Sequence, residues 1–507
     1  MDLISGILTY SEDSPMLFTR LYFWGFYFVL LLFYSLVYRK NSWRNAYLFL
    51  MSLFFYYQSG GYFFWLLVFS TITDFTLGHL IYGATTRLYK KLFLTVSVII
   101  NLGMLAWFKY AYFLTDMFNR VTGSDLEVVN ILSLWYNRLT GGSLDVSVIV
   151  LPVGISFFTF QTISYTVDVY RGKLKPVRSI IDFGFYVSFF PQLVAGPIVR
   201  AAEFVPQLYS KFRLTMQEMG HAIFLVISGL IKKMLISDYI SVNFIDRVFG
   251  SPLSYTGFEN LMALYGYSVQ IYCDFSGYTD IAIGLALLLG FKLPINFNSP
   301  YKALNITDFW RRWHISLSSW LRDYLYIPLG GNRKGHVRTY INLFITMLLG
   351  GLWHGAYLRF VIWGGLHGLA LGVHKLWLDI FPGRISHPLL RGTCRTLALF
   401  FTFQFVSFAW LFFRAENMQT ALDMLTQIIG SFSLHLVPQV IEAHIAVFSL
   451  IIATLIIHWL PSSFKENFRG VFIRTHTAVK LLVVVLVVFV IYQVMSAGIQ
   501  PFIYFRF

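Results

Sequence analysis

Apolar stretches of spanning length recur from one end of the chain to the other. A helix needs about 20 predominantly apolar residues to cross a bilayer, and the expected membrane segments lie near residues 16–38, 45–58, 62–82, 92–114, 146–166, 180–198, 219–240, 257–290, 338–352, 356–378, 396–414, 437–460 and 481–497. Pro152 interrupts the segment 146–166, and Pro191 and Pro197 interrupt the segment 180–198, which indicates kinked or re-entrant helices buried in protein. The pattern predicts an all-α polytopic membrane protein with about 10–13 membrane helices, some re-entrant or interfacial. No internal repeat or low-complexity linker is found, so we expect one integral membrane domain over residues 1–507.

The distribution of basic residues between the spans predicts the orientation. Lys and Arg gather at 39–44, 87–91 and 465–480, whereas 116–145 has few of them and 416–436 has none. Loops rich in Lys and Arg stay on the cytoplasmic side. We therefore expect both termini to be extracytoplasmic, with the last span, 481–497, followed by an extracytoplasmic tail at 498–507.

Composition supports the membrane assignment. Hydrophobic residues make up 57% of the chain, charged residues 12%, and the mean hydropathy is +0.64, whereas soluble domains carry about 25% charged residues. The net charge of +15 is spread over short clusters between apolar runs, which favours contact with membrane lipids and does not indicate nucleic acid. The two cysteines, Cys273 and Cys394, support neither a disulfide framework nor a metal site. The first fifteen residues contain no Lys or Arg, so we expect no cleavable signal peptide.

Polar residues concentrate in the stretch 305–333. A helix there would place two sets of side chains on different faces, namely Trp310, Trp313, His314, Leu317, Leu321 and Tyr324 on one, and Arg311, Ser318 and Arg322 on the other. Thr307 is the expected N-cap, and Gly330 and Gly331 are expected to end the helix. The helix is too polar to cross lipid, so it either lies at the interface with its arginines on lipid headgroups or lines a cavity with His314 pointing inward.

His354 stands in an apolar run close to three glycines. Gly350, Gly351 and Gly355 remove side-chain bulk around the imidazole, so a substrate or another backbone can approach it. Burial would keep the ring neutral and able to accept a proton. The alternative is a hydrogen-bonded histidine that only supports the packing of the bundle.

Two carboxylates, Asp274 and Asp280, lie in the apolar segment YCDFSGYTDIAIG at 272–284. A carboxylate in such a setting needs a cationic partner, and Arg311 or Arg312 would serve. A structural salt bridge is a better interpretation of both residues than a direct catalytic role.

Several long motifs resemble the membrane-bound O-acyltransferase family, and within it the bacterial branch that includes the alginate O-acetylation membrane protein. They are WRRWHISLSSWLRDYLYIPLGGNRKG at 310–335, LLGGLWHGA at 348–356, PVGISFFTFQTISYTVDVYRG at 152–172, FFPQLVAGPIVR at 189–200, and the 272–284 segment. The resemblance is strong over residues 100–380 and extends to the C-terminal tail.

The resemblance implies a bundle of membrane helices around a central funnel in a bacterial inner membrane. His354 corresponds to the essential histidine of the family, and His314 to a second polar position that is Asn, Asp or His in different members. An acyl thioester, most simply acetyl-CoA, would enter from the cytoplasm as a donor substrate, with no bound cofactor and no metal. The acceptor would be an extracytoplasmic polysaccharide, either an alginate-type exopolysaccharide or a cell-wall glycan. A partner with an SGNH-hydrolase-like extracytoplasmic domain would finish the transfer.

The arginine-rich stretch also suggests how the donor is held. Clustered guanidinium groups suit bidentate binding of phosphate. We expect the donor's phosphates to be bound from the cytoplasmic side by some of Arg311, Arg312, Arg322, Arg333 and Lys334.

The chain ends in FIYFRF at 502–507, which is similar to an aromatic C-terminal motif of the same branch. On that match Tyr504 is an acyl relay. A phenol, with a pKa of about 10, loses its proton to histidine far more readily than a sugar hydroxyl. The alternative is an aromatic anchor at the membrane interface.

Two other functions stay open at this point. A D-alanyl transferase for teichoic acid would use the same family architecture, although the span at 481–497 and the FIYFRF tail favour the acetylation branch. A non-enzymatic transporter or flippase of sugar or lipid would show internal repeats with paired broken helices, and the sequence shows none.

Overall fold

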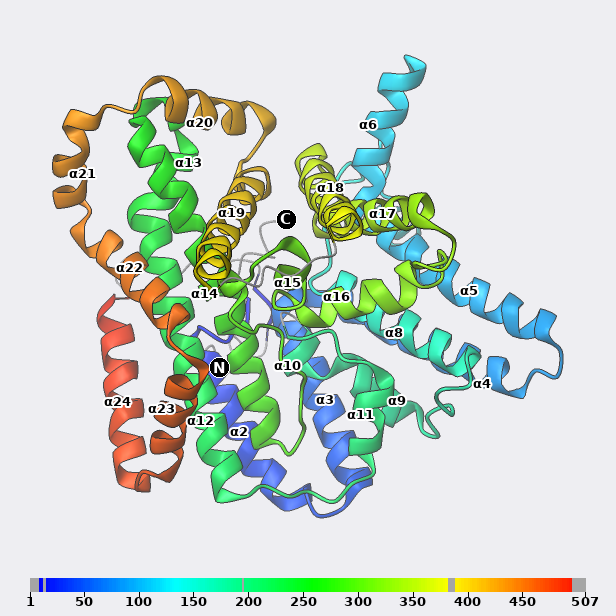
Figure 1. The fold of residues 1–507 in the computed structure, drawn as a ribbon. Coiled ribbons are helices and arrows are strands. Elements are labelled where there is room, and N and C mark those ends of the chain that lie inside the picture. Colours follow the sequence, from blue (N-terminus) through cyan, green and yellow to red (C-terminus); the bar gives the residue numbers. More distant parts are fainter. Residues whose placement is uncertain (1–8, 12–14, 194–195, 382–387, 495–507) are drawn as a thin grey trace. The chain divides into compact units, whose positions relative to one another are not determined.

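The computed structural model describes residues 9–11, 15–193, 196–381 and 388–494, of which 388–391 and 494 are described for the backbone only. All regular structure in these residues is helical, and they contain no β-strand (Figure 1). The chain forms two compact units. The first consists of Met1–Val194, Ile198–Phe212 and Gly355–Tyr357, and the second of Ala195–Pro197, Arg213–His354 and Leu358–Phe507.

The first unit contains the following helices and single turns: α2 (Leu21–Val37), α3 (Asn41–Gly60), η1 (Gly61–Phe63), α4 (Phe64–Gly83), α5 (Arg87–Leu105), η2 (Ala106–Tyr110), α6 (Ala111–Thr122), α7 (Ile131–Thr140), α8 (Ile155–Tyr170), α9 (Ile180–Ser188), α10 (Phe190–Leu193) and α11 (Ala201–Leu208). Helices α4, α5 and α8 pack against one another in this unit.

The second unit contains α12 (Met216–Leu230), η3 (Ile231–Asp238), η4 (Ser241–Ile245), α13 (Asp246–Gly250), η5 (Pro252–Ser254), α14 (Gly257–Leu288), η6 (Pro300–Lys302), α15 (Ile306–Trp310), α16 (Ile315–Leu321), η7 (Arg322–Tyr326), α17 (His336–His354), α18 (Leu358–Ile380), α19 (Pro388–Arg414), α20 (Met418–Gly430), η8 (Leu434–Leu436), α21 (Val437–Ala443), α22 (Ile445–Trp459), α23 (Ser462–Arg474) and α24 (Thr477–Val494). Helix α14 packs against α12, and α17 packs along α18 (Figure 1).

Local sequence signals explain where several of these helices begin. Thr256 and Glu259 form a reciprocal capping box at the start of α14, and Thr215 and Glu218 form another at the start of α12. In each, the hydroxyl accepts a hydrogen bond from the N3 backbone and the carboxylate accepts one from the N-cap backbone. Sequence rules for helix termini therefore hold inside this membrane protein.

The described helices confirm a multi-pass membrane protein. Five helices are long and apolar enough to cross a membrane, or up to seven if each of two bent pairs is one span, within the described residues. The pair α20 and α21 bends by 90° and the pair α22 and α23 by 98°, as broken or re-entrant helices do. The structure therefore confirms an all-α polytopic protein with broken helices. The central funnel stays a prediction.

Candidate active site

His354 is the last residue of α17 and lies within a cage of aromatic rings. Only 4% of its surface is exposed. The imidazole centroid lies 5.0 Å from that of Trp353, 5.1 Å from that of Trp363 on α18 and 5.1 Å from that of Phe413 on α19, each ring edge-on. Three helices therefore fix the position of one buried imidazole.

The glycines near His354 serve helix packing. A Cβ on Gly351 would stand 2.2 Å from the carbonyl oxygen of Phe360, and one on Gly364 would stand 2.4 Å from that of Met347. The backbones of α17 and α18 thus touch at this crossing, as small residues permit in membrane bundles. Gly350 faces Leu321 instead, whose Cδ1 lies 3.1 Å from the position of an added Cβ. We expected Gly350, Gly351 and Gly355 to allow either a substrate or another backbone to approach. Gly351 allows the close approach of another backbone.

His314 is fully buried and has an unusual backbone conformation. Its φ of +45° lies in the left-handed region, which costs free energy for a residue with a side chain and is often found at functional sites. Its Nδ1 lies 3.2 Å from the Oδ1 of Asn296, which also accepts hydrogen bonds from the backbone and hydroxyl of Ser316. Because Oδ1 only accepts, Nδ1 is the donor, and the neutral ring carries its lone pair on Nε2. Burial lowers the pKa of His314 to about 3.

Trp353 connects the two histidines. Its ring centroid lies 5.0 Å from that of His354 and 6.1 Å from that of His314. The second unit therefore brings together the two histidines that the sequence singled out, with one indole between them.

The single helix expected over 305–333 is interrupted. Asn305, not Thr307, caps α15, because its side chain accepts from the backbone N–H of Asp308 at 2.8 Å. The chain leaves the helix after Trp310 and starts α16 at Ile315, and the left-handed His314 lies at that restart. The prediction of one helix was wrong, because a local pattern of apolar residues does not register a turn held by a distant side chain.

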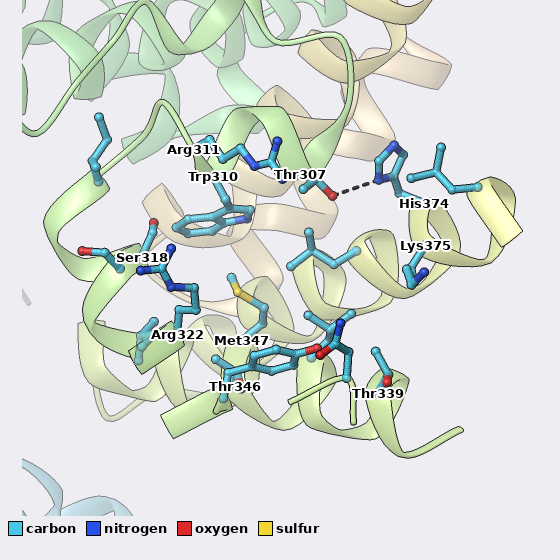
Figure 2. A pocket seen from close by; sticks show the side chains of 18 residues that line it. Thr307, Trp310, Arg311, Ser318, Arg322, Thr339, Thr346, Met347, His374 and Lys375 are labelled. Carbon is cyan, nitrogen blue, oxygen red and sulfur yellow. Dashed lines mark hydrogen bonds between the residues drawn. The ribbon is translucent and has the colours of Figure 1, made fainter. Parts of the chain in front are cut away.

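A pocket of about 600 Å³ lies beside this broken helix (Figure 2). It is lined by Thr307, Trp310, Arg311, Ile315, Ser318, Ser319, Leu321, Arg322, Tyr326, Asn332, Thr339, Leu343, Thr346, Met347, Leu371, His374, Lys375 and Leu378. Most of the surface that lines the pocket is apolar. Arg311, Arg322 and Lys375 supply its cationic side chains. Such a pocket suits an elongated ligand with an apolar part and an anionic group.

Two of the five basic residues expected to bind the donor line the pocket. These are Arg311 and Arg322, which line the pocket together with Ser318 although the helix is interrupted between Arg311 and Ser318 (Figure 2). Arg322 also pairs with Asp323, Nε to Oδ1, at 2.7 Å.

The other three do not line the pocket. Arg312 pairs with Asp308 at 2.8 Å, and Arg333 and Lys334 are exposed.

The sequence did not indicate His374 and Lys375 as part of this pocket. The Nδ1 of His374 lies 2.8 Å from the hydroxyl of Thr307, across the pocket lining (Figure 2). Both residues come from α18, which is distant in sequence from 305–333. Only the fold could bring them here.

Two rings in succession, Trp310 and Trp363, link the pocket lining to His354. Trp310 lines the pocket and packs 5.8 Å from Trp363, which packs 5.1 Å from His354. His367, which the sequence gave no reason to select, packs against both rings, with its centroid 5.2 Å from that of Trp310 and 4.8 Å from that of Trp363. It is fully buried, and its Nδ1 lies 3.3 Å from the indole nitrogen of Trp310, which donates.

Asp274 and Asp280 pair with lysines and not with Arg311 or Arg312. The Nζ of Lys233 lies 2.5 Å from Asp274 and 2.7 Å from Asp238, while Lys232 pairs with Asp280. The predicted type of interaction, an ion pair, is present, but the predicted partners were wrong. The lysines come from η3, which packs against α14.

Comparison with known proteins places these residues in a family. The family described as MBOAT, membrane-bound O-acyltransferase, matches residues 170–404, which include both histidines and the pocket. A peptidoglycan O-acetyltransferase of Helicobacter pylori is 38% identical over 84% of this chain and 82% of its own. The chain belongs to the membrane-bound O-acyltransferase family. It is therefore a multi-pass acyltransferase.

Other relatives in this family extend the comparison. A probable alginate O-acetylase AlgI of Pseudomonas putida is 36% identical over 92% of this chain and 95% of its own. A teichoic acid D-alanyltransferase of Bacillus subtilis is 30% identical over 52% of this chain and 69% of its own. Tyr504, the third catalytic residue expected from the family resemblance, lies outside the described residues.

Proposed function

We propose that this acyltransferase moves an acetyl group from a cytoplasmic thioester across the membrane for the O-acetylation of an extracytoplasmic polysaccharide. The observation that carries the proposal is the similarity, over most of both chains, to a peptidoglycan O-acetyltransferase and a probable alginate O-acetylase. The polymers in those two names are both glycans, so an alginate-type exopolysaccharide or a cell-wall glycan is the proposed acceptor.

His354 is the proposed general base. In its neutral form it accepts the proton of an attacking hydroxyl, and the resulting oxygen attacks the thioester carbonyl. Coenzyme A leaves as a thiolate and recovers the proton from the imidazolium. The aromatic cage supports this role because it holds the ring in place and keeps water from competing for the acyl group. His314, with its lone pair on Nε2, is proposed as the second polar group of the site.

The pocket beside α15 and α16 is the proposed donor site, and acetyl-CoA is the proposed donor. Its apolar walls suit the pantetheine arm, and Arg311, Arg322 and Lys375 suit phosphate. The succession of Trp310 and Trp363 between the pocket lining and His354 supports an arrangement in which the thioester reaches the base past these two rings.

Tyr504 is the proposed acyl relay. Its phenol loses a proton to His354, attacks the thioester and becomes a phenyl ester. This ester is activated relative to an alkyl ester. A serine of an extracytoplasmic SGNH-hydrolase-like partner then takes the acetyl group, regenerates the phenol and passes the acetyl to a glycan hydroxyl. We further propose that the protein lies in a bacterial inner membrane with both termini extracytoplasmic.

Incubation of the purified protein with acetyl-CoA labelled in the acetyl group tests this function. An acetyltransferase releases coenzyme A and carries labelled acetyl on the protein, whereas a transporter or flippase leaves the thioester intact. Replacing the donor with a D-alanyl thioester distinguishes the teichoic acid activity. Mass spectrometry of surface glycans from a deletion strain then identifies the acceptor by the acetyl groups that it loses.

A further inference from the structure

The first unit contains a buried polar cluster, and none of its residues belongs to the candidate active site of the second unit. Three packed helices each contribute two side chains to it, and all of these residues are 0% exposed: Ser70 and Asp74 on α4, Ser97 and Asn101 on α5, and Thr162 and Thr166 on α8. Each pair is spaced four residues apart, so both members lie on one face of their helix. The three faces therefore meet around a single carboxylate.

Neutral groups surround that carboxylate. The hydroxyl of Ser97 donates to Asp74 Oδ1 at 2.6 Å, and the amide of Asn101 donates to Oδ2 at 2.8 Å. Ser70 lies 3.5 Å from Oδ2 and 3.3 Å from the amide oxygen of Asn101. The hydroxyl of Thr162 lies 2.9 Å from that same oxygen. The cluster thus gathers oxygen atoms within a few ångströms of one another.

The charge of Asp74 is not balanced by a basic residue. No salt bridge to it is formed within the described part of the chain. By contrast, the buried carboxylate of Asp274 pairs with Lys233, and the partly buried carboxylate of Asp280 pairs with Lys232. A carboxylate without a cationic partner costs free energy inside a membrane domain. Such residues often mark sites that bind ions or protons.

We propose that this cluster binds a monovalent cation, Na⁺, between Asp74 and the surrounding hydroxyl and amide oxygens. Hard cations prefer oxygen ligands of this kind. One carboxylate matches one positive charge, whereas a divalent ion would leave an excess charge in a medium of low dielectric constant.

The hydroxyl groups on α8 can also supply oxygen ligands. Thr162 donates to the Oδ1 of Asn101 at 2.9 Å, because an amide oxygen only accepts, and Thr166 donates to the carbonyl oxygen of Ile163 at 3.2 Å. Each hydroxyl oxygen keeps a lone pair that can face a cation. Thr159 lies on the same face, and its buried hydroxyl has no hydrogen-bond partner in the described residues.

The site differs in kind from a transition-metal centre. No group of three or more His, Cys, Asp or Glu side chains in the described residues could hold a metal ion. This cluster has one carboxylate and otherwise neutral oxygens, which suits a weakly held alkali cation. The cation would tie α4, α5 and α8 together in the first unit, independently of the proposed acetyl transfer in the second.

Thermal unfolding of the full chain in detergent tests the proposal, with NaCl exchanged for choline chloride at constant ionic strength. We expect the wild-type Tm to rise saturably with Na⁺, by about 3–5 °C well above the Kd. Asp74→Asn should remove the rise. Asp116→Asn is the matched control, because Asp116 is an exposed carboxylate of the same unit that pairs with Arg120, and it should keep the rise.

Thr162→Val removes one ligand oxygen and keeps the side-chain shape, so it tests the site even if Asp74→Asn does not fold. We expect it to raise the Na⁺ concentration at half effect severalfold. An equal rise in choline chloride or in KCl, or an unchanged midpoint in Thr162→Val, would overturn the assignment to Na⁺. So would a Tm that follows pH and not Na⁺, because the carboxylate would then hold a proton.

Discussion

The ring contacts of His354 restrict which side chain can replace the imidazole without disturbing the packing around it. The imidazole is held by edge-on contacts with Trp353, Trp363 and Phe413, so a replacement should keep its volume and polarity while removing its basicity. Glutamine does this, since an amide does not accept a proton near neutral pH.

We therefore expect His354→Gln to lower acyl transfer by at least about 100-fold, the lower end of the usual contribution of a general base. The amount of folded protein and its Tm in detergent should stay close to wild type. His336→Gln is the matched control, because His336 begins the same helix and is exposed, and it should keep full activity. Wild-type acetylation in His354→Gln would remove His354 from the mechanism.

His314 should give the protein a measurable pH dependence of stability. Its folded-state pKa of about 3 lies below the usual value of about 6.5, so the unfolded chain takes up a proton first as the pH falls. Stability is therefore fully present above pH 6.5 and is lost as the pH falls toward 3, by about 2 kcal/mol between pH 8 and pH 5.

In His314→Asn this contribution should disappear, and the decrease in Tm between pH 8 and pH 5 should become smaller than in the wild type. The comparison is made as a difference between the two proteins, because other histidines contribute equally to both. The same pH dependence in wild type and His314→Asn would contradict a buried neutral imidazole at this position.

At the scale of elements, the stretch 305–333 shows what a sequence pattern reveals and what it misses. The pattern placed Arg311 and Arg322 on one face, and both line the pocket. It missed the break at His314, because hydrogen bonds between Asn296 and residues 314–316 hold that turn from eighteen or more positions away. Amphipathic faces are local information, whereas the turn depends on tertiary contact.

The same limit applies to the partners of the intramembrane carboxylates. Low dielectric requires a cation beside Asp274 and Asp280, and this requirement predicted an ion pair. Helix packing determines which basic residue forms the ion pair. Here η3 brings Lys232 and Lys233 to α14. Physical chemistry thus determines the type of contact, and the fold determines its partner.

Neutralising the arginines of the pocket should weaken donor binding. We expect Arg311→Gln combined with Arg322→Gln to raise the KM for acetyl-CoA about tenfold or more while changing kcat less, because charge-assisted hydrogen bonds to phosphate would be lost. Arg333→Gln combined with Lys334→Gln is the matched control, since neither residue lines the pocket. An unchanged KM in the first variant would make these arginines structural or lipid-facing.

The crossing of α17 and α18 should be sensitive to added volume. A Cβ on Gly351 would overlap the Phe360 carbonyl, so Gly351→Val should separate the helices and destabilise the protein by about 1–3 kcal/mol. Gly372→Val is the control, because no atom lies within 4 Å of an added Cβ there. Detergent Tm values measure both, and equal changes would contradict a tight crossing at Gly351.

At the scale of the whole molecule, hydropathy alone predicted an all-α multi-pass protein, and long helices such as α14 (Gly257–Leu288) match the expected segment 257–290 closely. Hydropathy did less well where the chain bends. The expected span 437–460 divides into α21 and α22, because apolar character persists through a turn that the backbone makes. The expectation of a single domain rests on the sequence alone and stays a prediction.

The proposed orientation of the C-terminus rests on the distribution of basic residues. Lys465, Arg469 and Arg474 lie on α23, just before the apolar helix α24. A basic segment before a span favours the cytoplasmic side, and α24 would then carry the chain across the membrane. On this argument we expect residues 498–507 to be extracytoplasmic, on the side where the proposed partner and acceptor would meet an acylated tyrosine.

Tyr504→Phe tests that arrangement, because it keeps the aromatic ring and removes only the hydroxyl. If Tyr504 carries the acetyl group, the variant still folds and inserts, but it loses covalent labelling by acetyl-CoA and glycan acetylation falls by at least about 100-fold, since no phenol is left to attack. If FIYFRF is an interfacial anchor, the ring alone suffices and activity stays near wild type. Tyr492→Phe is the matched control, because Tyr492 is an exposed tyrosine of α24, and it should keep both signals. Labelling with a membrane-impermeant thiol reagent at a cysteine introduced in 498–507 gives the sidedness separately, so a cytoplasmic tail would overturn the relay even if Tyr504→Phe were inactive.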